Sequence, residues 1–267
     1  MAARPGRAVE LVFVETLGDR TAHADIPIHT IGGQGVFVKE VQSAVLRGDA
    51  DIAAHSAKDL PSVTAGGLHI GAFCERRDAR DVLVGATLNG LPAGAEVATG
   101  SVRRRAQLAV VRPDLQFLEL RGSIHTRLGK VPAGGAIVMA AAALDILGLM
   151  HEIADYLPPA TFVPSPGQGC VAIECRSGDE EMLEVLAAID HAASRQAVEV
   201  ERAFLAELGS GCSLPVGAHA VDGTLTAFLA AAGGARHLLE TVDLPDEHDH
   251  AVARGAALAR SMRDRLP

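Results

Sequence analysis

The alternation of short apolar runs with helical patterns most strongly limits the fold of this 267-residue chain. From residue 51 to residue 147, runs that suit buried strands are separated by turns and by segments of helical periodicity. The predicted strands here are 51–54, 68–73, 96–99, 116–120 and 136–140, and the predicted helices are 102–111, 123–130 and 141–147. Strands that alternate with helices predict α/β domains with parallel sheets.

The rest of the chain extends this organisation. An earlier strand is predicted at 9–15, followed by a glycine-rich loop and a helix at 36–46. After residue 167 the pattern predicts helices at 182–189, 196–208 and 249–265, and strands at 216–221 and 224–231 joined by an Asp-Gly hairpin turn. We therefore expect two α/β domains and a small C-terminal α+β domain. The expected bounds are 1–73 with 168–190 for the first, 77–165 for the second and 192–267 for the third.

Composition excludes several classes of partner. A net charge of −9 argues against non-specific binding to nucleic acid or to anionic membranes. Aromatic residues make up only 3% of the chain, so few rings are offered for stacking on single-stranded nucleic acid. The longest apolar stretches, such as 134–144, are too short to span a bilayer, and the first residues do not resemble a signal peptide. We expect a cytoplasmic protein with no nucleic-acid or membrane partner.

The four cysteines do not form a metal-binding pattern. Cys170 and Cys175 are five residues apart, which is a poor spacing for metal ligands, and no CxxC motif occurs. A chain of this length needs no disulfide bonds to be stable. We expect no metal and a reducing compartment.

Cationic and hydroxyl side chains follow three of the predicted strands. Because ligands of open α/β sheets bind at the carboxyl ends of strands, these groups predict a site for a polyanion. The alternative is that the arginines pair with acids at the surface. The groups are Ser56, Lys58 and Asp59; Thr99, Ser101, Arg103 and Arg104; and Arg121, Ser123, Thr126 and Arg127.

Two single residues could carry chemistry. Asp59 lies among cations and should stay ionised, so it could stabilise a cationic intermediate or relay protons. A simple salt bridge with Lys58 explains it equally well. Cys212, in a Gly-Cys-Ser loop after a helix, is either a nucleophilic attachment point or an inert thiol.

Five segments occur in the order and spacing of one known family. They are 51–61 (DIAAHSAKDLP), 100–108 (GSVRRRAQL), 120–128 (LRGSIHTRL), 166–176 (PGQGCVAIECR) and 201–218 (ERAFLAELGSGCSLPVGA). Together they resemble the porphobilinogen deaminase (hydroxymethylbilane synthase) family from about residue 9 to the C-terminus. The resemblance implies two α/β domains like those of periplasmic binding proteins and a small C-terminal domain.

The resemblance also implies a reaction and a cofactor. A dipyrromethane cofactor would be held on Cys212 by a thioether, and four porphobilinogen units would be added head to tail with loss of ammonia. Water would then release hydroxymethylbilane, a linear tetrapyrrole. Asp59 and Lys58 would be catalytic, with Asp59 stabilising the azafulvene-like cation left by ammonia.

The remaining site residues that the resemblance implies would bind the cofactor and substrate or belong to a hinge or a lid. Each pyrrole carries acetate and propionate groups, which Lys58 and the arginines would hold with help from hydroxyl groups. Gln168 would lie in a hinge-like crossover between domains, and Phe37 in a mobile lid. The implied binding residues are Ser56, Thr99, Ser101, Arg103, Arg104, Arg121, Ser123, Arg127 and Gln168.

The chain also departs from the family pattern. The family begins with a strand and a helix that carry an Arg and a Ser, and this sequence starts just before the second strand, which predicts a truncated or misassigned start. Basic or polar residues usual in the family are replaced at Leu17, Thr30, Gln34, Ser123 and Ile146.

Three functions remain open from the sequence: an active monomeric transferase, a degenerate homologue that binds pyrrole carboxylates without turnover, and a small-anion binding module like a periplasmic receptor. Retention of Asp59 and Cys212 favours the first.

Overall fold

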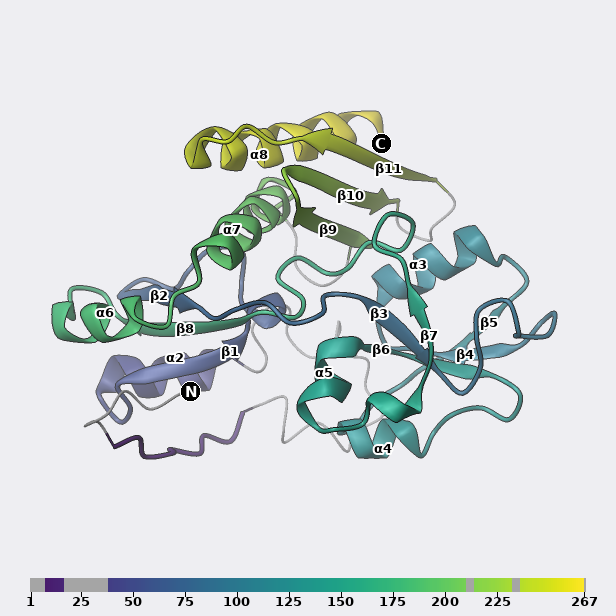
Figure 1. Cartoon of the computed structure of the whole chain (residues 1–267), viewed down its shortest axis with the longest axis horizontal. Helices are drawn as coiled ribbons and strands as arrows, with labels where there is room; N and C mark the ends of the chain where they lie inside the picture. The colour runs from purple at the N-terminus through teal and green to yellow at the C-terminus, as the bar shows by residue number, and fades with distance from the viewer. Residues whose placement is uncertain (1–7, 17–37, 210–213, 232–235, 267) are drawn as a thin grey trace.

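The computed structural model describes residues 8–16, 38–209, 214–231 and 236–266 (Figure 1). Within these residues the chain forms three separate sheets, each covered by helices. Two sheets belong to α/β layers, and the third belongs to a small C-terminal α+β unit, as predicted. The sheets draw on residues 52–73 with 171–176, on 81–157 and on 216–243.

The first sheet has the order β1-β8-β2, with β1 (Ile52–Ser56), β8 (Val171–Arg176) and β2 (Leu68–Phe73). β8 runs antiparallel to both neighbours. It lies between β1 and β2, which are close to each other in the sequence but far from β8. Helices α2 (Lys39–Arg47) and α6 (Glu180–Ala187) pack on the sheet, with Val45 and Leu186 fully buried. A short 3₁₀ helix, η2 (Ala57–Asp59), continues directly from β1.

The second sheet has the order β5-β4-β6-β3-β7. β4 is parallel to β5 and β6, whereas β3 is antiparallel to β6 and β7. Leu108 of α3 is fully buried against this sheet. The elements are β3 (Asp81–Val84), β4 (Glu96–Ala98), α3 (Val102–Val111), β5 (Gln116–Leu118), α4 (Ile124–Leu128), β6 (Ala136–Ala140), α5 (Ala141–Ile146), η3 (Met150–Glu152) and β7 (Ile153–Leu157).

The third sheet is a meander of β9 (Val216–Val221), β10 (Thr224–Ala230) and β11 (His237–Asp243). One face of it is covered by α7 (Ala192–Glu207) and α8 (His248–Arg265), which pack on each other (Figure 1). Phe204, Leu225 and Met262 are fully buried in the core between them.

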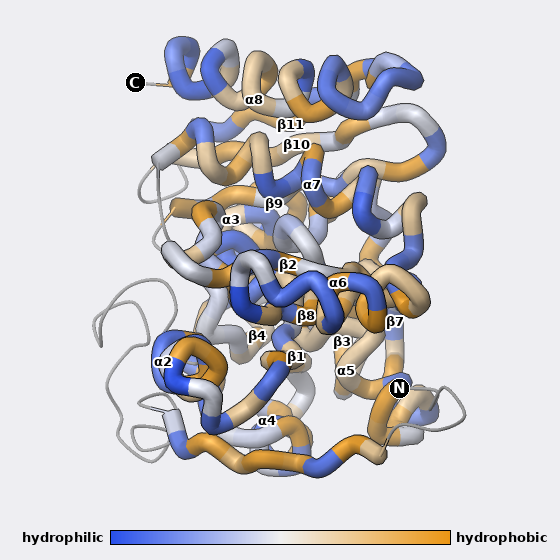
Figure 2. Tube along the Cα trace, turned by 90° about the vertical axis from the view of Figure 1, so that its left-hand side faces the viewer, coloured by the Kyte–Doolittle hydropathy of each residue, from blue (hydrophilic) through white to orange (hydrophobic). Residues whose placement is uncertain are grey.

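Two expectations about the sheets are wrong. Residues 8–16 contain no strand, and Leu11 and Phe13 are 74% and 90% exposed. Figure 2 shows this hydrophobic stretch outside the packed layers. A strand needs a neighbour to accept its backbone hydrogen bonds, and among the described residues this stretch pairs with none. The two α/β sheets are also not parallel. In the first sheet β8 runs antiparallel to both neighbours, and the second sheet is mixed because β3 runs antiparallel to β6 and β7.

A buried carboxylate joins the C-terminal unit to the two segments that connect the α/β sheets, one between β2 and β3 and the other between β7 and β8. Glu201 of α7 is completely buried and accepts hydrogen bonds from the backbone N–H groups of Gly167 (2.7 Å) and Ala220 (2.8 Å). It also forms an ion pair with Arg76 at 2.6 Å. The Arg76 guanidinium holds the pKa of Glu201 below its usual value, although burial acts in the opposite direction. The crossing segments are thus fixed against α7 at the level of Gln168.

Candidate active site

The structure brings the three predicted strand-end groups together. η2 follows β1 and carries Lys58 and Asp59, and α3 follows β4 and carries Arg103 and Arg104. α4 follows β5 and carries Arg127. Burial lowers the pKa values of Lys58 and Arg127, and the charges of Asp59 and Arg104 act on both groups. These side chains therefore share one electrostatic environment, built from two different sheets.

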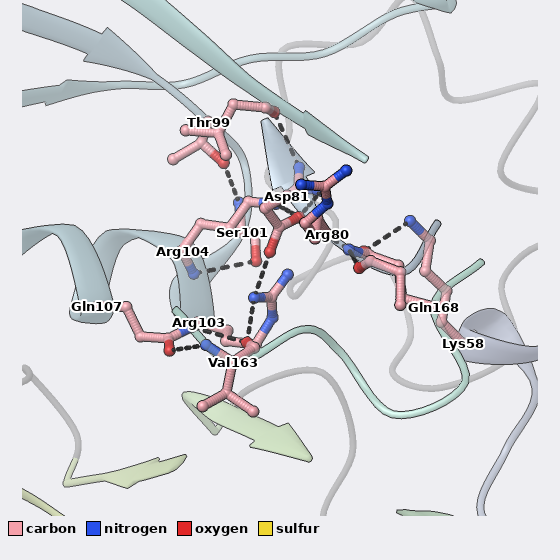
Figure 3. A network of polar contacts seen from close by, with 12 residues as sticks. Lys58, Arg80, Asp81, Thr99, Ser101, Arg103, Arg104, Gln107, Val163 and Gln168 are labelled. Carbon is pink, nitrogen blue, oxygen red and sulfur yellow. Dashed lines mark hydrogen bonds and ion pairs between the residues drawn. The ribbon is translucent and has the colours of Figure 1, made fainter. Parts of the chain in front are cut away.

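Asp81, the first residue of β3, is the anionic centre of this cluster (Figure 3). It is completely buried and forms ion pairs with Arg103 at 2.6 Å and with Arg104 at 2.7 Å. Burial alone would raise its pKa, but the two guanidinium groups outweigh this and hold the pKa far below its usual value. The remaining guanidinium contacts include the carbonyl oxygens of Val163 (2.7 Å) and Val138 (2.9 Å). Arg103 and Arg104 are thus fixed and partly neutralised.

Gln168 connects this anionic centre to Lys58 (Figure 3). Its side-chain amide donates to the Asp81 carboxylate (3.0 Å) and to the carbonyl of Ala79 (2.7 Å), and its Oε1 accepts from Lys58 Nζ at 3.4 Å. The structure therefore gives Lys58 a side-chain partner other than Asp59. Loss of hydration lowers the pKa of Lys58, and the negative charge of Asp59 acts against that effect.

Positive charge remains in excess over the whole cluster. Arg127 is partly buried, its Nε donates to the carbonyl of Gly122 at 2.8 Å, and loss of hydration lowers its pKa. Among the described residues, the cluster holds five cations, Lys58, Arg103, Arg104, Arg121 and Arg127, and two carboxylates, Asp59 and Asp81. By contrast, the neighbouring Arg105 pairs with Glu119 near the surface, so the surface-pairing interpretation holds for that arginine.

Most of the predicted hydroxyl residues have local roles in the backbone. Ser101 is the N-cap of α3 and accepts from the N–H of Arg104, and Ser123 is the N-cap of α4 and accepts from the N–H of Thr126. Thr99 is 1% exposed, and its hydroxyl accepts from the N–H of Ser101 at 3.2 Å. Ser56 is exposed at the end of β1.

The positions that replace usual family residues are only partly described. Ile146 is 59% exposed at the last position of α5, and Ser123 retains the capping role given above. The predicted attachment residue Cys212 and lid residue Phe37, together with Leu17, Thr30 and Gln34, lie outside the described residues.

The described cysteines are protonated thiols at neutral pH. Burial raises the pKa values of Cys74 and Cys175, and raises that of Cys170 to about 12. All three are free. A thiol must lose its proton to attack, so these three are poor nucleophiles. Among the described residues, no group of His, Cys, Asp and Glu side chains suits a metal ion, and no helix has the length and apolar character to cross a membrane.

Sequence reasoning missed Asp81. Its only sequence signal is a carboxylate at the start of a buried apolar run, DVLV, and nothing local pairs it with arginines 22 and 23 residues away. Gln168, which the family resemblance had indicated, lies 110 residues from its partner Lys58.

We expect Asp81→Asn to destabilise the protein by about 3–5 kcal/mol at neutral pH, because it leaves two buried guanidinium groups without their counter-ion. The folded-state pKa of Asp81 is depressed, so its stabilisation is complete above the unfolded value of about 3.9 and is lost as the pH falls below that value. The measurement is the free energy of unfolding of the unchanged protein and of Asp81→Asn, determined with urea between pH 3 and pH 7. The stability difference should shrink towards acid, and a difference independent of pH would contradict the assignment.

Gly167→Ala should lower both stability and activity. Gly167 has a φ of +74°, and a Cβ atom there would lie 3.0 Å from the backbone and Cβ of Ala57 and 3.1 Å from the amide nitrogen of Lys58. The added methyl group would displace the segment that carries Lys58 and Asp59, and it would adopt an unfavourable backbone conformation. We expect a loss of about 1–3 kcal/mol in thermal unfolding and a lower kcat. Gly178→Ala, with a similar φ of +79° but open space, is the matched control.

Two family models and several relatives match this chain. A model of the porphobilinogen deaminase dipyromethane cofactor binding domain matches residues 1–184, and a model of the porphobilinogen deaminase C-terminal domain matches residues 195–264. The porphobilinogen deaminase of Geobacter metallireducens is 41% identical over 90% of this chain and 78% of that protein. The one from Acidothermus cellulolyticus is 48% identical over 80% of this chain and 66% of that protein.

These matches define a class of cofactor-bearing transferases that act in tetrapyrrole synthesis. The chain belongs to the porphobilinogen deaminase family. Among solved structures, a substrate-binding protein of an amino acid ABC transporter from Streptococcus pneumoniae covers 61% of this chain and 71% of its own at 16% identity. Its TM-score is 0.31, which is too distant a likeness to support a function.

Proposed function

We propose that this chain joins four porphobilinogen units into hydroxymethylbilane, releasing ammonia for each unit, on a dipyrromethane held by Cys212. The observation that carries the proposal is the convergence of Lys58, Asp59 and the arginines of α3 and α4 from two sheets onto one cluster. A receptor for a small anion needs the cations but has no use for a carboxylate placed among them.

The donors of the cluster fit the dipyrromethane group. Pyrroles with acetate and propionate substituents present several carboxylates, and the cluster has positive charge in excess. When bound, the group supplies the pyrrole to which the first unit is joined. Arg103 and Arg104 are held rigidly by Asp81 and would present their remaining N–H donors to it. Arg127 makes no ion pair with a described carboxylate and would bind carboxylates of the incoming units.

Asp59 and Lys58 would serve the chemical step itself. Loss of ammonia leaves positive charge on the substrate, and an ionised carboxylate close to that charge lowers the barrier. Asp59 is exposed and therefore accessible to substrate. Lys58, which donates a hydrogen bond to Gln168, would bind a substrate carboxylate.

The proposed setting is a cytoplasmic monomer that uses porphobilinogen and binds neither nucleic acid nor membrane. Cys74, Cys170 and Cys175 are free thiols, which supports a reducing compartment.

The test is to incubate purified protein with porphobilinogen and to measure porphobilinogen consumed, ammonia released and hydroxymethylbilane formed. We expect one ammonia for each porphobilinogen consumed and the linear product. Arg254→Gln, which removes an exposed charge from α8, should behave like the unchanged protein. Binding of porphobilinogen without ammonia release would instead indicate the degenerate homologue.

A further inference from the structure

Apart from the cluster around Asp81, a cavity with cationic side chains in its lining lies between the first α/β sheet and the C-terminal unit. It has a volume of about 330 Å³ and is bounded by the 62–64 loop, by β2 and by α7, which packs over β2 (Figure 1). Its polar lining consists of Ser62, Thr64, His69, Arg195, Glu199 and Arg202. None of these residues belongs to the cluster around Asp81.

Arg202 is the most deeply buried of the charged residues in the lining of this cavity. It is only 9% exposed, and within the described chain its hydrogen bonds are from Nη2 to the carbonyl oxygens of Pro61 (2.8 Å) and Ser62 (3.2 Å). It makes no ion pair with a described carboxylate, whereas Arg103, Arg104 and Arg76, which are similarly enclosed, all do. Loss of hydration lowers its pKa, and the more distant charges of Glu174 and Glu199 oppose this effect. No Arg202 nitrogen is a buried atom without a partner, so its unused N–H donors are open to the cavity, where an oxyanion can accept hydrogen bonds from them.

The neighbouring charges are already balanced. Arg195 forms ion pairs with Asp190 (2.8 Å) and Glu199 (2.9 Å), and Glu199 also contacts His248 at 2.7 Å. The single carboxylate in the lining is therefore engaged by its own partners. Arg202 remains as the cation with donors to spare, and the hydroxyl groups of Ser62 and Thr64 and the ring of His69 line the same cavity.

We infer that this cavity binds the oxyanion group of a small molecule, either a carboxylate or a phosphate, through Arg202 with Ser62, Thr64 and His69. Arginine offers paired N–H donors to either group, and hydroxyl groups complete the remaining oxygens. The site is separate from the proposed active site, so it does not depend on the proposed function. It would tie α7 to the loop that follows Asp59 by two residues, and ligand binding there would stabilise the contact between the C-terminal unit and the first sheet.

The test is calorimetric titration of the full chain with inorganic phosphate and, separately, with succinate, which distinguishes the two anion classes. We expect saturable binding of at least one of them, weakened about tenfold or more in Arg202→Gln, since a charge-assisted hydrogen bond is lost. Arg254→Gln on α8 is the matched control and should leave the affinity unchanged. Arg127→Gln removes a cation of the other cluster, and the affinity should also survive that change.

Arg202→Gln also removes hydrogen bonds to the loop, so a second set of variants guards against a folding defect. Arg202→Lys keeps the charge but loses the paired donors, and Ser62→Ala and His69→Gln leave Arg202 in place. Circular dichroism establishes that each variant is folded. Weakened binding in these folded variants supports the site. No saturable binding of either anion, or binding lost in Arg127→Gln but retained in Arg202→Gln and Arg202→Lys, would overturn it.

Discussion

Cys212→Ala is expected to yield a folded protein that carries no covalent cofactor and has no measurable turnover. This expectation rests on the proposed attachment of the cofactor to Cys212. The three described cysteines have pKa values raised by burial and are therefore weak nucleophiles. The intact mass of the purified protein provides the measurement. The unchanged protein should show the mass excess of a dipyrromethane, and the variant should show the mass of the bare chain.

Cys175→Ala is the control for the first prediction, because Cys175 is a free thiol that is fully buried in the first sheet. Its mass excess should be retained. A mass excess that persists in Cys212→Ala would place the attachment on another residue. A bare mass in the unchanged protein would mean that this chain does not load the cofactor, which is the outcome expected of a degenerate homologue.

Asp59→Asn should lower kcat by about 10²–10³-fold with a much smaller change in KM. The substitution keeps the shape of the side chain and removes the negative charge that would stabilise the cation formed when ammonia leaves. Because Asp59 is exposed, thermal stability should hardly change. Steady-state rates of porphobilinogen consumption, together with the intact mass to establish that cofactor is loaded, make the measurement.

Asp246→Asn is the matched control for this second prediction, since Asp246 is an exposed acid in the loop before α8. Its kcat should equal that of the unchanged protein. If Asp59→Asn kept its kcat while fully loaded with cofactor, the role of Asp59 would reduce to a surface charge beside Lys58.

Elements that depend on local sequence were predicted closely. β2 and α3 have the predicted bounds, 68–73 and 102–111, because a short buried run and a capped helix ended by Pro113 are defined by neighbouring residues. β9 and β6 likewise match their predicted ranges. α7 begins at Ala192, four residues before its predicted start, because His191 caps it by accepting from the N–H of Ser194.

Elements that depend on distant partners were not predicted. β8 pairs with β1 in a register that joins Ile52 to Cys175, and no local pattern reports such a pairing. The run at 9–15 has the composition of a strand, yet it pairs with no strand of the described residues, because composition does not supply a neighbouring strand.

The sequence by itself determined the family, the kinds of side chain available to the site and the strand ends at which they occur. Ordered motifs and the periodicity of apolar residues are local properties, so they can be recognised without a structure. Only the tertiary structure decided the charge balance of the site. It buried Asp81 between Arg103 and Arg104, gave Lys58 the amide of Gln168 as its partner, and enclosed Arg202 without an ion pair to any described carboxylate. Electrostatic interactions depend on distance and burial rather than on separation along the chain, and those two quantities exist only once the chain has folded.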